Sequence, residues 1–340
     1  MTAQDGYASL LVAYPVRLRR RHGAELIATM LEMAGPDGRP TRADRWRLVL
    51  DGLRERFRLP PRRPLAVVAA VLALLIGGAL GAAAGSWVGM WTFAKVPAPG
   101  PMADRMLGAD SVPHSLTQGR FWTDSTRVLK PGVDATAAAN SARARIVAEG
   151  WTATPVVVSG GGADGRYRRA SFQADSGGVR IMVRSYYSED HQIDLGGWSL
   201  RPPTYLPLVF AGLLLGLLGG WLAAAALAYR IAGSFRRRAS AGTAAAGLVL
   251  LAIPAASVYV FLVQTLPDRR DLGVVEFVHR ALGISPAYTM NWWQTLGPSW
   301  LTSPYVNKVL LLAGLAAVAG AAIIGRPGRA MRKPTDPQAA

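Results

Sequence analysis

The residues best suited to chemistry lie in the segment 188–194, where Glu189, Asp190 and Asp194 surround His191. Three carboxylates and an imidazole could together supply ligands to a weakly bound divalent cation. The segment lacks the ordered ligand spacing of a calcium-binding hand, so a solvated loop is the simpler interpretation. We therefore assign no metal or other cofactor from the sequence.

A glycine-rich stretch at 159–165 is the other local pattern that resembles a chemical motif. It lacks the Lys-Ser/Thr ending of a phosphate-binding loop and lies between two predicted strands, which favours a hairpin loop. The four histidines share no metal-ligand spacing, and no nucleophile and base form a recognisable pattern. The chain contains no cysteine, which excludes thiolate chemistry and disulfides. These observations do not predict an enzyme.

Four apolar stretches, at 65–91, 204–229, 241–264 and 305–325, dominate the chain. Each is near or above the roughly 20 residues that a helix needs to cross a bilayer. The fourth reaches that length only by including the residues around Lys308, whose side chain would extend toward water. The first three contain no Asp, Glu, Lys, Arg or His, which argues against proton relays or ion sites inside them. The sequence therefore predicts an α-helical integral membrane protein with four transmembrane helices.

The distribution of charge gives these spans an orientation. Residues 1–64 carry 13 Lys and Arg against 7 Asp and Glu, and the segments 230–240 and 326–340 are also basic. The positive-inside rule therefore places both termini in the cytoplasm of a multi-pass plasma-membrane protein, with 92–203 and 265–304 outside. The net charge of +17 is then explained by anchoring to anionic lipid, since no nucleic-acid-binding motif accompanies it.

Residues 1–64 are expected to form a cytoplasmic helical hairpin, joined by the Pro- and Gly-rich turn 35–40. Thr41 and Asp44 form a predicted capping box at the start of the second helix. An apolar stripe follows on that helix, made of Trp46, Val49, Leu50, Leu53 and Phe57. So small a hairpin has little core, so two interpretations stay open: the helices cover each other, or a partner docks on them.

A family resemblance appears in this head. The run 10–26 contains Tyr14-Pro15, a basic cluster that includes Arg20, and Glu25-Leu26, with Trp46 in the second helix. It resembles the N-terminal head of actinobacterial HAAS-like signalling membrane proteins, and the resemblance is limited to about the first 60 residues. It implies communication with a PadR-like transcriptional regulator, with Tyr14, Arg20, Glu25 and Trp46 as structural or partner-facing positions. His22 stands where a Tyr is more usual.

The segment 92–203 is expected to fold as a small extracytoplasmic α+β domain. A Pro-rich, irregular lead at 97–113 precedes a helix over 134–149 with Asp134 as its N-cap. Three strands are predicted after this helix, at 154–158, 167–174 and 179–183. The simplest fold is one helix packed against an antiparallel meander.

Glycines recur at every fourth position in the first two spans. This spacing places them on one face of each helix, where another backbone can approach closely. Contact between the first two spans is the preferred interpretation, and homodimer contact is the competing one. The positions are Gly77, Gly81, Gly85 and Gly89 in the first span and Gly212, Gly216 and Gly220 in the second.

The third span contains Pro254, which predicts a kink that could serve as a hinge or be tolerated through repair by neighbouring helices. Beyond it, 271–282 is expected to form an amphipathic interfacial helix. An aromatic belt should follow at the outer interface rather than a ligand-stacking site, formed by Trp292, Trp293, Trp300 and Tyr305.

Taken together, these features favour a non-enzymatic signalling or regulatory protein. Its outer domain would be coupled through packed spans to a head that binds a cytoplasmic protein. The alternative is an accessory subunit of an ABC-type or permease transport system, because charge-free spans argue against coupled transport by this chain alone.

Overall fold

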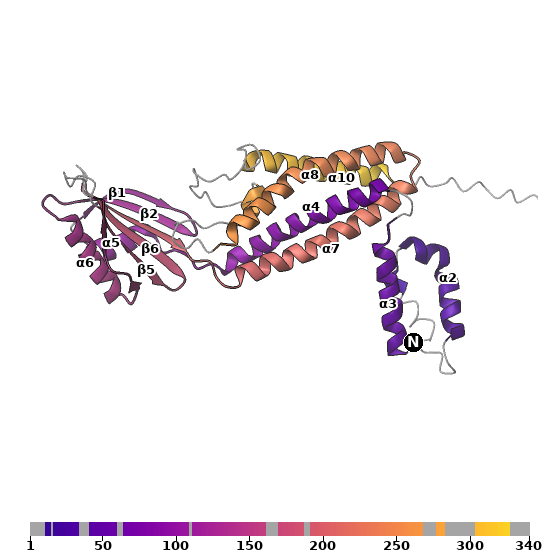
Figure 1. The fold of residues 1–340 in the computed structure, drawn as a ribbon, viewed down its shortest axis with the longest axis horizontal. Helices are drawn as coiled ribbons and strands as arrows, with labels where there is room; N and C mark the ends of the chain where they lie inside the picture. The colour runs from indigo at the N-terminus through magenta and orange to yellow at the C-terminus, as the bar shows by residue number, and fades with distance from the viewer. Residues whose placement is uncertain are drawn as a thin grey trace, which may run out of the picture. The chain divides into compact units, whose positions relative to one another are not determined.

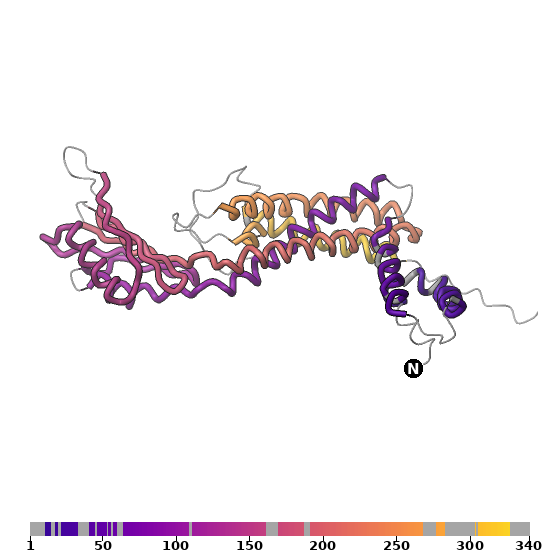
Figure 2. The backbone as a smooth tube through the Cα atoms, turned by 60° about the horizontal axis from the view of Figure 1, so that its bottom comes forward, coloured from indigo at the N-terminus to yellow at the C-terminus, as the bar shows by residue number. Residues whose placement is uncertain are grey.

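The computed structural model describes residues 11–14, 16–33, 41–59, 64–108, 111–160, 169–186, 191–267, 277–282 and 303–326. The chain divides into two compact units. The first comprises 1–80, 214–255 and 309–340, and the second comprises 81–213 and 256–308. Figures 1 and 2 show the ribbon and the backbone tube, coloured by residue number.

Four long apolar helices are the main feature of the described residues. They are α4 (Pro64–Gly89), α7 (Tyr205–Ala232), α8 (Arg237–Thr265) and α10 (Pro304–Ile324). By length and composition all four could span a membrane, including the fourth, whose apolar segment runs from Tyr305 to Ile324. α4 is followed by a 3-10 turn, η2 (Met90–Thr92).

The glycine faces of α4 and α7 meet within one chain. In the first unit, a Cβ added at Gly77 would lie 2.7 Å from the Cα of Gly220, and Gly216 offers its carbonyl oxygen to the same face. In the second unit, a Cβ at Gly212 would clash with the carbonyl of Gly81 and lie 3.0 Å from the Cα of Gly85. Only glycine permits backbones to approach this closely.

The same face continues to the last predicted glycine of α4. A Cβ at Gly89 would lie 2.8 Å from the ring of Tyr205, the first residue of α7. The structure thus brings all seven predicted glycines to one helix–helix contact.

A second close helix contact, which the sequence pattern does not predict, joins α8 to α10. A Cβ at Gly247 would lie 3.0 Å from the carbonyl oxygen of Gly314, and one at Gly314 would lie 2.6 Å from Leu251. Ser240 Oγ donates a hydrogen bond of 2.8 Å to the carbonyl of Ala321. Glycine spacing gives no signal here because no two glycines of α8 or of α10 are four residues apart.

The segment between α4 and α7 is built on a seven-stranded antiparallel sheet in the order β1-β2-β7-β6-β5-β3, with β4 also paired to β5. The strands are β1 (Ser111–Gln118), β2 (Trp122–Leu129), β3 (Thr152–Ala153), β4 (Val157–Ser159), β5 (Arg169–Ser176), β6 (Val179–Tyr186) and β7 (Gln192–Ser199). Two helices, α5 (Pro99–Leu107) and α6 (Ala135–Ala148), cover one face (Figure 1). The buried core between them includes Met102, Met106, Ile146, Ile181 and Leu195.

The prediction for the helix at 134–149 is confirmed, since α6 begins after Asp134, whose carboxylate accepts a 2.8 Å hydrogen bond from the Ala137 amide. The expected irregular lead at 97–113 is wrong. Pro99 instead opens α5, where its missing N–H costs nothing and its fixed φ suits a first helical turn. Strands β1 and β2 were also missed, because polar residues fill both of their faces.

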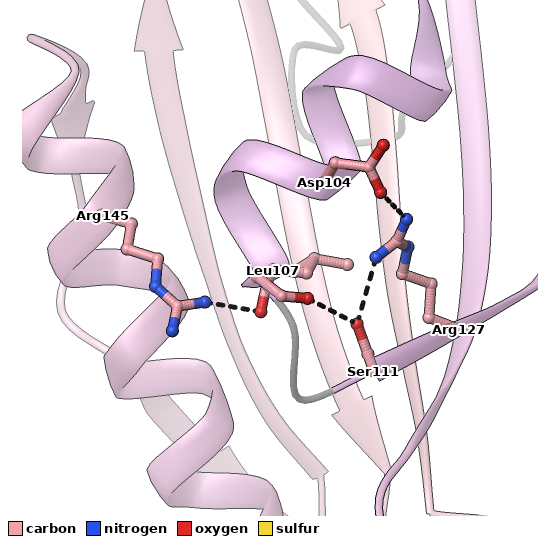
Figure 3. A network of polar contacts seen from close by, with 6 residues as sticks. Asp104, Leu107, Ser111, Arg127 and Arg145 are labelled. Atoms are coloured by element: carbon pink, nitrogen blue, oxygen red, sulfur yellow. Dashed lines mark hydrogen bonds and ion pairs between the residues drawn. The ribbon is translucent and has the colours of Figure 1, made fainter.

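A buried arginine fastens α5 to the first two strands (Figure 3). The guanidinium of Arg127 on β2 is 4% exposed and pairs with Asp104 on α5. It also donates a long hydrogen bond of 3.4 Å to Ser111 Oγ on β1. Arg145 on α6 donates a 2.6 Å hydrogen bond to the carbonyl of Leu107 at the end of α5. These contacts hold both helices in register on the sheet.

The head contains η1 (Leu11–Ala13), α2 (Val16–Met33) and α3 (Arg42–Phe57). The predicted capping box of Thr41 and Asp44 is confirmed. The head is more than the predicted pair of helices, because η1 contacts both of them. Leu11 and Tyr14 are buried in the small core together with Met30. A Cβ at Gly52 would lie 2.8 Å from Ala13, so η1 lies directly against α3.

Gly212→Ala should lower the thermal unfolding temperature of the detergent-solubilised chain, because the new methyl group enters the backbone contact with α4. Overpacking of this kind costs roughly 1–3 kcal/mol. Gly219→Ala is the matched control, since nothing lies within 4 Å of a Cβ at Gly219. Equal unfolding temperatures for the two variants would show that the glycine contact does not stabilise the fold.

Candidate functional site

The most connected polar site in the described residues lies where α4, α7 and the 3-10 turn η5 (Val278–Leu282) meet. Ser86 Oγ on α4 lies 2.7 Å from Tyr205 Oη on α7 and 2.9 Å from His279 Nδ1 on η5. All three residues are almost fully buried, with exposures of 0%, 0% and 2%. We call Ser86, Tyr205 and His279 the outer hub.

Main-chain groups of η5 extend the hub to the other two long helices. The Val278 amide donates to Tyr205 Oη over 3.1 Å, and the His279 amide donates to Ser86 Oγ over 3.3 Å. Asn307 Nδ2 on α10 donates to the Ala281 carbonyl over 2.9 Å and to Ser257 Oγ on α8 over 3.0 Å. Three residues of η5, Val278, His279 and Ala281, therefore connect it to α4, α7 and α10 directly and to α8 through Asn307.

An aromatic cluster links the outer hub to the sheet domain. Phe277 precedes η5, and its ring lies 5.2 Å from Phe121 in the β1–β2 turn and 5.0 Å from Phe93 after α4, in edge-to-face contacts. Phe93 also packs 5.2 Å from Tyr205 of the hub. Such pairs contribute beyond their buried area. The β1–β2 turn and the hub are thus parts of one packed core.

Two further contacts anchor the sheet beside the same cluster. The amide of Ser199, at the end of β7, donates a 3.0 Å hydrogen bond to the carbonyl of Phe121, and Ser199 Oγ donates to the carbonyl of Ala94. Arg201 donates to the carbonyl of Thr265, the last residue of α8. The chain segments that enter and leave the sheet are both fixed at this point.

Burial determines the protonation state of the hub. Desolvation, assisted by the charge of Arg280, lowers the pKa of His279 to about 4. The imidazole is therefore neutral at physiological pH and shares a hydrogen bond with Ser86 through Nδ1. Its Nε2 is buried, and no hydrogen bond to this atom occurs among the described residues. A neutral, enclosed network of this kind is suited to fixing helix ends in one arrangement.

The hub changes two expectations from the sequence. His279 was expected on an amphipathic interfacial helix, but Val278–Leu282 is a 3-10 turn with Val278, His279, Ala281 and Leu282 all buried. Residues 271–276 and the belt residues Trp292, Trp293 and Trp300 lie outside the described residues. Tyr305, the remaining belt residue, is 79% exposed at the start of α10. His279, which belongs to the connection between α8 and α10, therefore packs its imidazole against the uncharged parts of α4 and α7.

The four head residues predicted as structural or partner-facing positions differ in how they are placed. Tyr14 is buried, and burial together with the nearby carboxylates Asp51 and Glu55 raises its pKa. Glu25 is exposed on α2 and lies 2.9 Å from His22. Trp46 is 62% exposed on α3. Arg20 belongs to α2, and its side chain lies outside the described residues.

The acidic segment expected as a solvated loop becomes partly strand. Glu189 and Asp190 lie outside the described residues, whereas Asp194 is the third residue of β7, on the sheet face opposite the core. Burial raises the pKa of Asp194, and burial with the charge of Asp194 raises that of Asp124 on β2. Within the described ranges, no three His, Asp or Glu residues are grouped as metal ligands.

Two other predicted features stay as predictions. The segment 161–168, which includes most of the glycine-rich loop, lies outside the described residues, between β4 and β5. Pro254 lies inside α8, which continues on both sides of it as one helix. The glycine-rich loop and the hinge at Pro254 therefore both stay predictions.

Comparison with known proteins gives no assignment, since no family, curated protein or solved structure matches this chain.

Tyr205→Phe should destabilise the full chain by roughly 1–3 kcal/mol, because it leaves the Val278 amide and Ser86 hydroxyl short of a buried partner. The measurement is thermal unfolding in detergent. Tyr305→Phe is the matched control, since Tyr305 is 79% exposed. An unfolding temperature for Tyr205→Phe equal to that of the control would mean that the hub does not hold the helices together.

Proposed function

We propose that this protein is a membrane-anchored regulator that transmits the state of its outer domain to a cytoplasmic protein bound by its head. The observation that carries the proposal is the contact of Phe121, in the β1–β2 turn, with Phe277, next to the outer hub. A change in the sheet that moves this turn must also move η5. Because η5 is bonded to helices from all four spans, it would alter how their ends pack.

The charge distribution supports the direction of this coupling. The head, the 230–240 connection and the C-terminal tail are the basic segments, as expected for the cytoplasmic side. The sheet domain would then lie outside. Its face opposite the core carries Asp124 and Asp194 on neighbouring strands, and burial raises the pKa of each carboxyl, so a bound cation or basic ligand would favour their charged forms.

The head would pass the change to the cytoplasmic partner. Only six residues, 58–63, separate the end of α3 from the start of α4, so displacement of α4 is passed to the head over a short connection. The resemblance of residues 1–60 to HAAS-like heads suggests a PadR-like transcriptional regulator as the partner. The exposed surface of α2 around Glu25 is available to such a protein, whereas Tyr14 is a core residue.

Affinity purification of the full chain from its native cells, through a C-terminal tag, should recover a small soluble DNA-binding regulator. Glu25→Lys should reduce its recovery, since a charge reversal in a contact suppresses association by like-charge repulsion. Glu149→Lys, in the outer domain, is the control and should leave recovery unchanged. Recovery of an ATPase or permease subunit instead would favour a transport role, and recovery insensitive to Glu25→Lys would remove α2 as the binding surface.

A further inference from the structure

Helix α3 has two apolar faces, and only one of them is covered. Leu48 and Gly52 face η1 and the small core of the head. At about 100° per residue, Trp46, Leu50 and Phe57 lie within about 40° of one another on the opposite side of the helix. Trp46 and Leu50 are 62% and 59% exposed. Of the predicted stripe, Trp46 and Leu50 are thus left exposed, and the side chain of Leu53 lies outside the described residues.

The acidic residues of α3 lie away from this open face, while its five arginines are spread around the helix. Arg42 and Arg54, both exposed, lie about 60° to either side of its centre. The three acidic residues of α3 lie within about 60° of Leu48, on the covered side. Their effect on Tyr14 agrees with this placement, because Asp51 and Glu55 raise the pKa of its buried hydroxyl. The open face therefore combines an apolar centre with positive flanks.

The chain also keeps α3 close to the membrane. The six residues 58–63 between α3 and α4 can span at most about 20 Å when fully extended. In the first unit, Trp221 Nε1 of α7 donates a 3.0 Å hydrogen bond to the carbonyl of Phe57, the last residue of α3. A helix tethered this tightly meets the bilayer surface at a high effective concentration.

We propose that α3 lies on the inner surface of the bilayer, with Trp46 and Leu50 inserted at the boundary between headgroups and acyl chains and with Arg42 and Arg54 bound to anionic lipid phosphates. An apolar face with Trp and Leu, arginine flanks and carboxylates on the far side is the pattern of a helix lying in the membrane interface. Lipid phosphates are anionic acceptors that Arg42, at the start of α3, and Arg54, near its end, can both reach at a membrane surface. This assigns Trp46 to lipid rather than to a protein partner, and it does not depend on the proposed function.

The test uses the full chain in lipid nanodiscs. Because the chain contains no cysteine, a single spin label can be placed by Leu50→Cys without further changes. In discs containing phosphatidylglycerol, the label at Leu50 should be shielded from a water-soluble relaxation agent. In discs of phosphatidylcholine alone it should be more accessible. A label at Ala43, also exposed and on the open face, should behave in the same way, whereas one at Thr29 on α2 should stay accessible in both lipids.

Replacing Arg42 and Arg54 by Gln in the Leu50-labelled chain should lower the ratio of docked to undocked α3 about fivefold per arginine. Equal accessibility of the Leu50 and Ala43 labels in both lipids would overturn the proposal. Shielding that depends on two copies in one disc would overturn it in favour of self-association. Shielding that appears only after a purified cytoplasmic protein is added would overturn it in favour of protein docking.

Discussion

Satisfying the polar side chains near the ends of the long helices is the constraint on which this structure depends. Ser86, Ser257 and Asn307 belong to helices that are otherwise apolar at these positions, and each is completely buried. A polar group left without a partner in an apolar environment is costly. The hydroxyls of Ser86 and Ser257 and the Nδ2 of Asn307 find partners in Tyr205, in one another and in η5, and this requirement fixes where the connection between α8 and α10 must return.

Close helix contact is the second requirement, and glycine meets it. The α4–α7 approach lets each helix place its backbone against the other, with no side chain between Gly77 and Gly220 or between Gly85 and Gly212. Such a contact leaves the two helices few alternative packings, because any rotation would bring a side chain into the backbone. Rigid pairing makes the pair a suitable element to carry a displacement from Tyr205 and Ser86 toward the head.

Much of this organisation could be predicted from local sequence. The four apolar helices, the Asp134 cap and the Thr41–Asp44 capping box follow from composition and short spacing, which act within a few residues. The hub does not, because His279 and Ser86 lie 193 positions apart and neither belongs to a motif. Its only sequence signal is a few polar residues, Ser86, Tyr205 and Asn307, in or beside apolar stretches. Strand β1 was missed for another reason: it is exposed along almost its whole length and so shows no apolar alternation.

The central claim is that the sheet and the helix ends form one mechanically continuous core through Phe277. Hydrogen–deuterium exchange of the full chain in nanodiscs tests it most directly, comparing wild type with Phe277→Ala and with Phe235→Ala, whose side chain is 96% exposed. We expect Phe277→Ala to increase amide exchange in the β1–β2 turn and at the ends of α4 and α7, and Phe235→Ala to leave both unchanged. Faster exchange confined to residues 277–282, with the turn and the helix ends as protected as in wild type, would contradict the account.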